Sequence, residues 1–420
     1  MREMKDSGIE WIGAIPQDWK TDRLQWHLKE INVSNNPIQT KNILSLTIEA
    51  GVIPYAEKGN QGNKAKEDYS QYKIALPDTL VINSMNVIIG AVGISQYFGC
   101  VSPVYYVFEP IEGTDLRYIY YLFTNTGFQK EMRKYAKGIL EIRLRISSND
   151  MLKRIVPSPP FKEQQRIADY LDKMCAEIDA VLEKTRASIE EYKKLKQAVI
   201  TQAVTKGIRG DRPMKDSGSV WFEEIPCNWV MKRIKYLFHI KKDIAGKEGY
   251  TVLSITQSGI KPKDLSKNEG QLADNYSHYQ LLNPGDFAMN HMDLLTGWVD
   301  ISKYSGVTSP DYRVFVLDDT EKNDSSYYLY LMQMCYFNRI FYGLGQGVSG
   351  MGRWRLQADK FLNFPVVVPP VDEQKEIASY LNEKCSCIEV MIAKKQQYLT
   401  EIENYKKSLI YEYVTGKREV

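Results

Sequence analysis

Long apolar runs are missing from this sequence. No stretch of about 18 apolar residues exists, because the most apolar one, residues 80–94, is interrupted by Asn83 and Asn86. The first residues, MREMKDSGIEW, are charged and lack the apolar core of a signal peptide. Because 43% of the residues are nevertheless apolar, a disordered chain is excluded. We expect a globular, cytoplasmic protein with no membrane segment.

Cysteine and histidine are few, and neither is clustered. Among the six cysteines only Cys385 and Cys387 are close, and their CxC lacks the second pair of ligands that a zinc site needs. We expect reduced, structural thiols, because disulfides are rare in the cytosol. The four histidines show no HxxxH spacing. The sequence therefore predicts no metal site.

Motifs for nucleotide cofactors are also missing. The sequence has no GxxxxGK[ST] phosphate loop and no NPPY or DPPY tetrapeptide. Residues 341–345 read FYGLG, which fits the FxGxG pattern of an S-adenosylmethionine-binding turn. Such a turn follows a buried strand and opens a helix, whereas an aromatic, helix-like segment precedes this one. We expect no cofactor on this chain and no catalytic residue.

An internal repeat organises the chain. The motif MKDSGIEWIGAIPQDW at residues 4–19 recurs as MKDSGSVWFEEIPCNW at residues 214–229. Near the end of each half, EQQRIADYL at residues 163–171 recurs as EQKEIASYL at residues 373–381. Both pairs keep an offset of 210, which slips to 209 and 207 between them. The two halves are one unit duplicated, with insertions and deletions confined to its middle.

Each half reads as a globular domain followed by a long helix. The first part mixes short β-like runs, turn signals and a helical patch, the pattern of an α+β domain. The helix begins after a Pro-rich stop, VPSPP at Val156 or VVVPP at Val366. The predicted boundaries are residues 1–155 and 213–365 for the two globular domains, 156–212 for a central helical spacer and 366–420 for a C-terminal one.

Apolar residues in both helices follow the alternating steps of three and four that indicate a coiled coil. The predicted C-terminal seam contains Ile377, Leu381, Ile388, Met391, Tyr398, Ile402, Tyr405 and Leu409, with Lys384 and Lys395 filling two gaps. The first copy shows a one-residue stutter in the seam of Ile167, Leu171, Met174, Ile178, Val181, Ile189, Tyr192, Val199 and Ala203. We expect the helices to pair as an antiparallel coiled coil within one chain, related by a pseudo-two-fold axis and acting as a spacer between the domains. Separate helix hairpins or intermolecular coiled coils are the alternative.

Two head-to-tail globular domains, each followed by a PP-x-x-EQ element and a long helix, resemble the type I restriction-modification specificity subunits. The resemblance covers essentially all 420 residues. The element stands here as Pro159, Pro160, Glu163 and Gln164, and as Pro369, Pro370, Glu373 and Gln374. The resemblance implies a non-catalytic DNA-binding subunit with two target-recognition domains, each reading one part of an asymmetric, bipartite site.

The same resemblance implies the partners of such a subunit. Besides double-stranded DNA, they are two methyltransferase (M) subunits and, for cleavage, the restriction/translocase (R) subunits. S-adenosylmethionine, ATP and Mg are then expected on the partner subunits, with no cofactor bound by this chain.

Basic residues gather where a DNA surface is needed, although the formal net charge is only +3. Residues 130–154 hold eight basic and three acidic side chains, and such clusters attract phosphates. The segments AKGILEIRLRI and GQGVSGMGRWRL each contain an Arg-x-Arg pair whose guanidinium groups share a face in an extended chain. Arginine is the commonest bidentate reader of guanine. A solvated strand edge, or a salt-bridged entry to the core, is the alternative.

A second candidate surface is the segment that differs most between the halves, residues 54–69 against residues 261–276. Its Gly, Asn, Gln and Lys residues suit both phosphate and base-edge contacts, although an ordinary surface loop is the competing interpretation. The predicted DNA-binding residues are Lys64, Lys66, Lys134, Lys137, Arg143, Arg145, Lys261, Lys263, Arg353 and Arg355. The matched tryptophans Trp11, Trp19, Trp221 and Trp229 are interpreted as domain core rather than as platforms for base stacking.

Three other functions compete with this hypothesis. A specificity subunit of a fused methyltransferase-nuclease system would share the architecture. An enzyme that acts on DNA alone would need the motifs that are missing. A coiled-coil scaffold without DNA contact would show no salt-dependent DNA binding.

Overall fold

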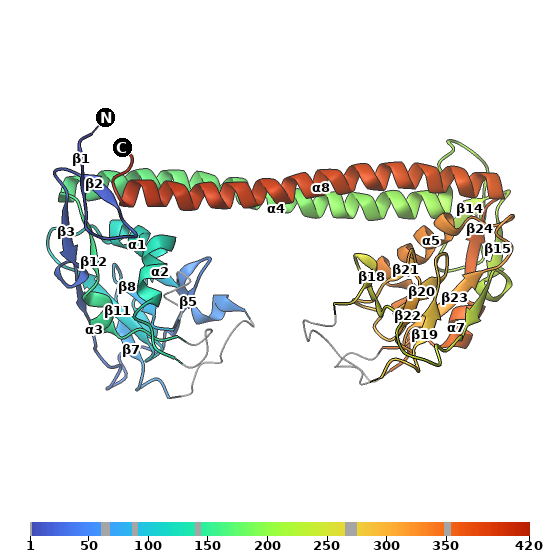
Figure 1. Cartoon of the computed structure of the whole chain (residues 1–420), viewed down its shortest axis with the longest axis horizontal. Coiled ribbons are helices and arrows are strands. Elements are labelled where there is room, and N and C mark those ends of the chain that lie inside the picture. The colour runs from blue at the N-terminus through green and yellow to red at the C-terminus, as the bar shows by residue number, and fades with distance from the viewer. Residues whose placement is uncertain (1, 60–67, 86–90, 139–143, 265–274, 348–353) are drawn as a thin grey trace. The chain divides into compact units, whose positions relative to one another are not determined.

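The computed structural model describes residues 2–59, 68–85, 91–138, 144–264, 275–347 and 354–420. The chain divides into two compact units: residues 1–186 with 397–420 form unit 1, and residues 187–396 form unit 2. Each unit combines one globular domain with parts of the two long helices, α4 (Phe161–Lys206) and α8 (Val371–Val414) (Figure 1). No helix within the described ranges is long and apolar enough to cross a membrane.

The globular domain of unit 1 is built on a four-stranded antiparallel sheet. Its strand order is β4 (Leu28–Glu30), β11 (Tyr105–Pro110), β8 (Leu80–Asn83) and β9 (Val92–Ile94). Two-stranded ladders pair β1 (Met4–Asp6) with β2 (Ala14–Pro16), β3 (Lys20–Arg23) with β12 (Ile155–Ser158), β5 (Leu44–Thr47) with β6 (Gly51–Pro54), and β7 (Lys73–Ala75) with β10 (Gly99–Val101). The shorter helices are α1 (Leu116–Thr124), α2 (Thr126–Arg133) and α3 (Ser148–Leu152).

The domain of unit 2 repeats this plan. Its four-stranded sheet has the order β16 (Phe238–Lys241), β23 (Arg313–Leu317), β20 (Phe287–Met289) and β21 (Val299–Ile301). Two-stranded ladders pair β13 (Met214–Asp216) with β14 (Glu224–Pro226), β15 (Val230–Arg233) with β24 (Pro365–Val368), β17 (Leu253–Thr256) with β18 (Gly259–Pro262), and β19 (Gln280–Leu282) with β22 (Gly306–Thr308). The shorter helices are α5 (Ser325–Phe337), α6 (Ile340–Leu344) and α7 (Ala358–Asn363).

The matching strand orders confirm the predicted duplication and the α+β class of the two domains. Local capping is duplicated as well. Asp115 begins α1 by accepting hydrogen bonds from the backbone N–H groups of Arg117 and Tyr118. Asp324 caps α5 in the same way through Tyr327. An aspartate at this position satisfies N–H groups that have no partner within the helix, so both copies begin their helix at the same point.

The core of each unit is shared between its globular domain and the long helices. In unit 1 the fully buried Trp19 and Tyr118 belong to one cluster with Leu171 of α4 and Leu409 of α8. Unit 2 has the equivalent cluster, which joins its domain core to Ile200, Val204, Ile377 and Leu381. Residues of both long helices therefore contribute to the core of each domain.

Contacts between α4 and α8 confirm antiparallel pairing in each unit. In unit 1, Tyr170, Asp179 and Arg186 of α4 contact Tyr413, Lys406 and Glu403 of α8, respectively. In unit 2, Tyr192 contacts Lys395 and Lys196 pairs with Glu389. Residue numbers rise along α4 while those of their partners fall. The two helices of one chain therefore pair with each other, as the repeat predicts.

The register of the seam differs from the predicted one. Along α8 the positions Lys384, Met391, Tyr398 and Tyr405 are exposed, whereas the residue after each of them is buried or half-buried. The seam of α8 runs through Ala378, Leu381, Cys385, Ile388, Ile392, Lys395, Leu399, Ile402, Lys406, Leu409 and Tyr413. That of α4 runs through Ala168, Leu171, Cys175, Ile178, Leu182, Thr185, Ile189, Tyr192 and Lys196. The prediction of a stutter in α4 is therefore wrong, since steps of three and four continue without a break.

The error has a physical cause in the side chains that occupy the seam. Cys175 and Cys385 are small and apolar enough to be buried there, with 5% and 4% of their surface exposed. Thr185 can be buried because its hydroxyl donates to the carbonyl oxygen of Val181, one turn earlier, at 2.8 Å. The predicted seam contained Val181, which is 41% exposed, in place of its buried neighbour Leu182.

Candidate nucleic-acid interface

The second arginine of each Arg-x-Arg pair forms an antiparallel bridge with a residue earlier in the chain. Lys137 and Arg145 exchange two backbone hydrogen bonds of 2.8 Å in unit 1. Gln346 and Arg355 exchange bonds of 2.9 and 3.0 Å in unit 2. The first members of the two pairs, Arg143 and Arg353, lie outside the described residues. The structure therefore places Arg145 and Arg355 at equivalent points of the two domains.

Both described arginines point away from the core. Arg145 and Arg355 are exposed, while the next residues, Ile146 and Leu356, are fully buried. This alternation is that of an extended segment lying on a domain surface. Arg145 is partly fixed, because its Nε donates to Ser84 Oγ at 3.1 Å. The location suits either DNA contact or a solvated strand edge, and DNA contact stays a prediction.

The basic cluster of unit 1 is less positive than its composition indicates. Lys134 forms ion pairs with Glu131 at 2.9 Å and with Glu10 at 3.3 Å, and these hydrogen bonds raise its pKa. Arg154 stacks on the ring of Tyr135, with its guanidinium carbon 3.3 Å from the ring centroid. Lys134 is thus partly neutralised by its neighbours, and phosphate binding would have to compete with these contacts.

In unit 2 the described part of the second candidate surface begins on a small hairpin. Lys261 is exposed on β18 and Lys263 follows it, half-buried. The corresponding hairpin of unit 1 is β5 with β6, but Lys64 and Lys66 lie outside the described residues. A role for this segment in DNA contact therefore stays a prediction.

The PP-x-x-EQ element joins each long helix to its globular domain. Gln164 accepts a hydrogen bond from the backbone N–H of Asp115 at 2.9 Å and donates one to the carbonyl oxygen of Pro159 at 2.9 Å. Gln374 repeats both contacts with Asp324 and Pro369, at 2.8 and 2.9 Å. The helix start and the capped start of α1 or α5 are therefore held by one glutamine in each unit.

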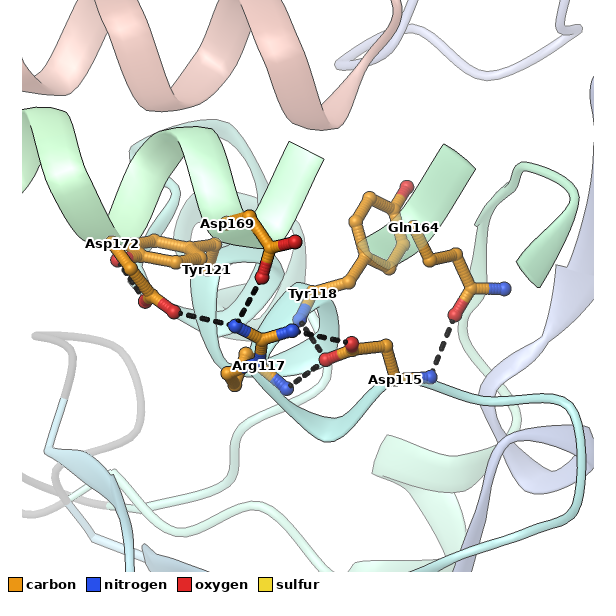
Figure 2. Close-up of polar contacts among 7 residues, drawn as sticks. All are labelled: Asp115, Arg117, Tyr118, Tyr121, Gln164, Asp169 and Asp172. Atoms are coloured by element: carbon orange, nitrogen blue, oxygen red, sulfur yellow. Dashed lines mark hydrogen bonds and ion pairs between the residues drawn. The ribbon is translucent and has the colours of Figure 1, made fainter. Parts of the chain in front are cut away.

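In unit 1 an ion-pair network adds to this junction. Figure 2 shows Arg117 of α1 facing the carboxylates of Asp169 and Asp172 on α4, to which it donates at 2.7 and 2.9 Å. Tyr121 donates its hydroxyl hydrogen to Asp172 at 2.7 Å. These contacts join α1 to α4 at a partly exposed junction, so they serve to position the domain on the helix.

Two of the four matched tryptophans are core residues, as predicted. Trp19 and Trp229 are 1% and 0% exposed, and each donates its indole N–H to a glutamate, Glu163 or Glu373, at 3.0 Å. Trp221, by contrast, is 37% exposed, and it approaches α6 at Gly343, where an added Cβ would lie 3.0 Å from the indole.

Close packing accounts for the glycines of the FxGxG segment. Phe341 is buried in α6, which follows α5 directly in the chain rather than a strand. A Cβ at Gly345 would lie 2.5 Å from the ring of Trp354. Both glycines therefore allow an aromatic ring to pack closely against the backbone. Among the described residues there is also no cluster of three His, Cys, Asp or Glu side chains that could hold a metal ion.

Sequence reasoning missed a groove in unit 2, close to Arg355. The groove has a volume of about 580 Å³, and its basic lining residues are Lys242, His291, Arg313 and Arg355. They come from segments far apart in the sequence, and only Arg355 belongs to a motif. The single signal that could have marked the groove is that His291 and Arg313 replace Ser84 and Tyr106 of the first copy.

Comparisons with known proteins agree with this architecture. The family model for the type I restriction modification DNA specificity domain matches residues 16–191 and again residues 226–401. A curated relative is the type I restriction enzyme MjaVIII specificity subunit of Methanocaldococcus jannaschii, 26% identical over 321 residues. That alignment covers 73% of this chain and 71% of the relative.

Two solved structures share the fold over nearly the whole chain. One comes from a study of complex assembly and conformational transition of the type I R-M system; it superposes with a TM-score of 0.71 at 12% identity and covers 96% of this chain and 99% of that one. The other is the HsdS subunit from Thermoanaerobacter tengcongensis, with a TM-score of 0.50, 13% identity and coverage of 96% and 98%. At such identities the likeness shows the fold alone.

Proposed function

Because the chain belongs to the type I restriction modification DNA specificity family, we propose that it is the DNA-reading specificity subunit of a type I restriction-modification enzyme. Each globular domain reads one part of an asymmetric, bipartite site. The observation that supports this most is the duplication itself. Two copies of one scaffold present an exposed arginine at the same bridged position, Arg145 and Arg355, but differ in the residues around it.

The chemistry of the enzyme then belongs to its partners. We propose that two methyltransferase subunits bind this subunit, that the restriction/translocase subunits join them for cleavage, and that the complex works in the cytoplasm. S-adenosylmethionine, ATP and Mg act on those subunits, and this chain is not catalytic. Its contribution is to hold two recognition surfaces in one covalent unit, so that the site read by one domain is linked to the site read by the other.

A domain exchange tests this function directly. Residues 1–155 are replaced by the corresponding domain of another specificity subunit, and methylated sites are mapped in cells that carry the partner subunits. Only one half of the methylated site should change. Replacing residues 213–365 is the matched control, and it should change only the other half. If either exchange alters both halves, or neither half, the assignment of one domain to one half-site is wrong.

A further inference from the structure

The groove beside Arg355 is lined by donors and cations without any counter-charge. Of the thirteen described residues that line it, none is an aspartate or a glutamate. Lys242 and Arg355 are exposed at its surface, and Gln346 and Gln357 add two amides that hydrogen-bond to each other at 3.2 Å. Apolar side chains, among them Ile240 and Pro310, form the rest of its wall. The groove therefore combines apolar walls with a concentration of hydrogen-bond donors.

One of the cations that line this groove, Arg313, is buried although no aspartate or glutamate lines the groove. Arg313 is 6% exposed and donates to the carbonyl oxygen of Leu356 at 2.9 Å, while its guanidinium lies 5.0 Å from the ring centroid of Phe361. Burial lowers its pKa to about 10, so it stays charged at neutral pH. No carboxylate stands among the described residues that line the groove around it. A buried cation without a counter-charge is unfavourable, and an acceptor group entering the groove would offset that cost.

His291 adds an unused polar atom at the same place. Its Nδ1 is buried and has no hydrogen-bond partner among the described residues. Burial and the charges of Arg313 and Arg355 lower the pKa of its ring to about 4, so the ring is neutral at pH 7. Unpaired buried polar atoms are rare in folded proteins and call for an explanation, such as a ligand.

The equivalent place in unit 1 is organised differently. Ser84 and Tyr106 occupy the positions of His291 and Arg313 in unit 2. The Tyr106 hydroxyl donates a hydrogen bond to the carbonyl oxygen of Ile146, and Arg313 donates one to the carbonyl oxygen of the equivalent residue, Leu356. Lys73 lies 3.8 Å from the Glu30 carboxylate, so an acid lies beside the cation there. Two domains with one scaffold therefore differ in charge and donors at matched positions, which is what reading two different sequences requires.

We infer that the groove of unit 2 reads the acceptor edge of a guanine in the half-site of the second domain, with Arg355 as the contacting side chain and Arg313 and His291 as the polarised wall behind it. The inference rests on the proposed function. Guanine presents O6 and N7 in the major groove, the pair of acceptors that a guanidinium matches with two hydrogen bonds. Apolar walls suit the edge and face of a base better than a phosphate, which stays in water.

Substituting Arg355→Gln tests this inference in the full chain assembled with its methyltransferase partners. Arg355 is exposed, so the variant should fold. Its binding is measured on a library with randomised half-sites and as a function of salt. The preference for guanine at one position of the second half-site should fall about 5- to 150-fold, with the first half-site unchanged. The matched variant Arg145→Gln should leave the second half-site intact.

Base analogues sharpen the measurement. Replacing the recognised guanine by 7-deazaguanine removes N7 and should weaken wild-type binding, but should weaken the Arg355→Gln variant no further. A uniform loss of affinity for all sequences, with the salt slope reduced by about one, would show a phosphate contact and overturn the inference. Unchanged preference and slope would overturn it as well. If the wild-type complex itself shows no preferred site, the proposed function fails instead.

Discussion

Glu373, near the start of α8, accepts a hydrogen bond from the indole N–H of Trp229 at 3.0 Å, although 144 positions separate the two residues. The guanidinium of Arg212 contacts the other carboxylate oxygen and lies over the tryptophan ring. Unit 1 repeats the arrangement with Glu163, Trp19 and Arg2. The glutamate of the PP-x-x-EQ element therefore joins three segments of each unit.

Removing this carboxylate should destabilise unit 2 strongly. The Glu373 side chain is 1% exposed, so Glu373→Ala leaves a half-buried guanidinium and a buried indole N–H without their partner. We expect a loss of about 3–5 kcal/mol in the free energy of unfolding, measured by urea denaturation. Glu163→Ala is the control: that side chain is 19% exposed, and water can replace part of its contacts, so the loss should be smaller. Equal losses would contradict the role given to burial.

The domain of unit 1 should fold without the ion pairs of Arg117. Unit 2 has Ser326, Ser379 and Asn382 where unit 1 has Arg117, Asp169 and Asp172. The arginine is 39% exposed, so Arg117→Ser should cost about 0.5–1 kcal/mol, measured by thermal or urea unfolding. The triple variant that installs all three residues of unit 2 should recover most of that loss, since both α4 carboxylates that faced the arginine are then replaced, and Asp115 keeps the backbone N–H groups that it caps. If the triple variant were less stable than Arg117→Ser, charge pairing alone would not account for the stabilising effect of the network.

Adjacent substitutions in α4 test the register of the seam. Leu182 is 5% exposed, whereas Val181 is 41% exposed. Leu182→Ala should therefore lower the free energy of unfolding by about 2–5 kcal/mol, while Val181→Ala should cost less than about 1 kcal/mol. Hydrogen exchange of the α4 backbone amides measures the loss of helix stability in each variant independently. The reverse order of effects would support the register predicted from sequence.

Stability should depend on the ionisation of His291. Burial and two nearby arginines lower the pKa of its folded form from 6.5 to about 4, so the unfolded chain binds a proton more readily. Its contribution to stability is therefore complete above about pH 6.5 and is lost as the pH falls toward 4. A His291→Gln variant should lose less stability than the wild type across that window. His278→Gln, at an exposed site outside the groove, is the matched control substitution.

The duplication, the α+β domains and the antiparallel helix pair were all predictable from sequence, because they depend on patterns that the chain repeats. An offset of 210 marks equivalent positions wherever packing has kept the same residues, as at Trp19 and Trp229 or Gln164 and Gln374. The seam was only partly predictable. Steps of three and four indicate a coiled coil, but small or polar side chains such as Cys385 and Thr185 enter a seam only when tertiary contacts make room for them.

The candidate interface, too, could be predicted only in part from the sequence. The sequence by itself determined that two equivalent Arg-x-Arg pairs exist and that the chain is a duplicated unit. Both features depend only on the order of the amino acids. Only the tertiary structure decided that Arg355 shares a groove with Arg313 and His291, whereas Arg145 is bound to Ser84. The physical reason is that charge and hydrogen bonding act through space over a few ångströms, and folding brings together side chains whose separation in the sequence carries no trace of that distance.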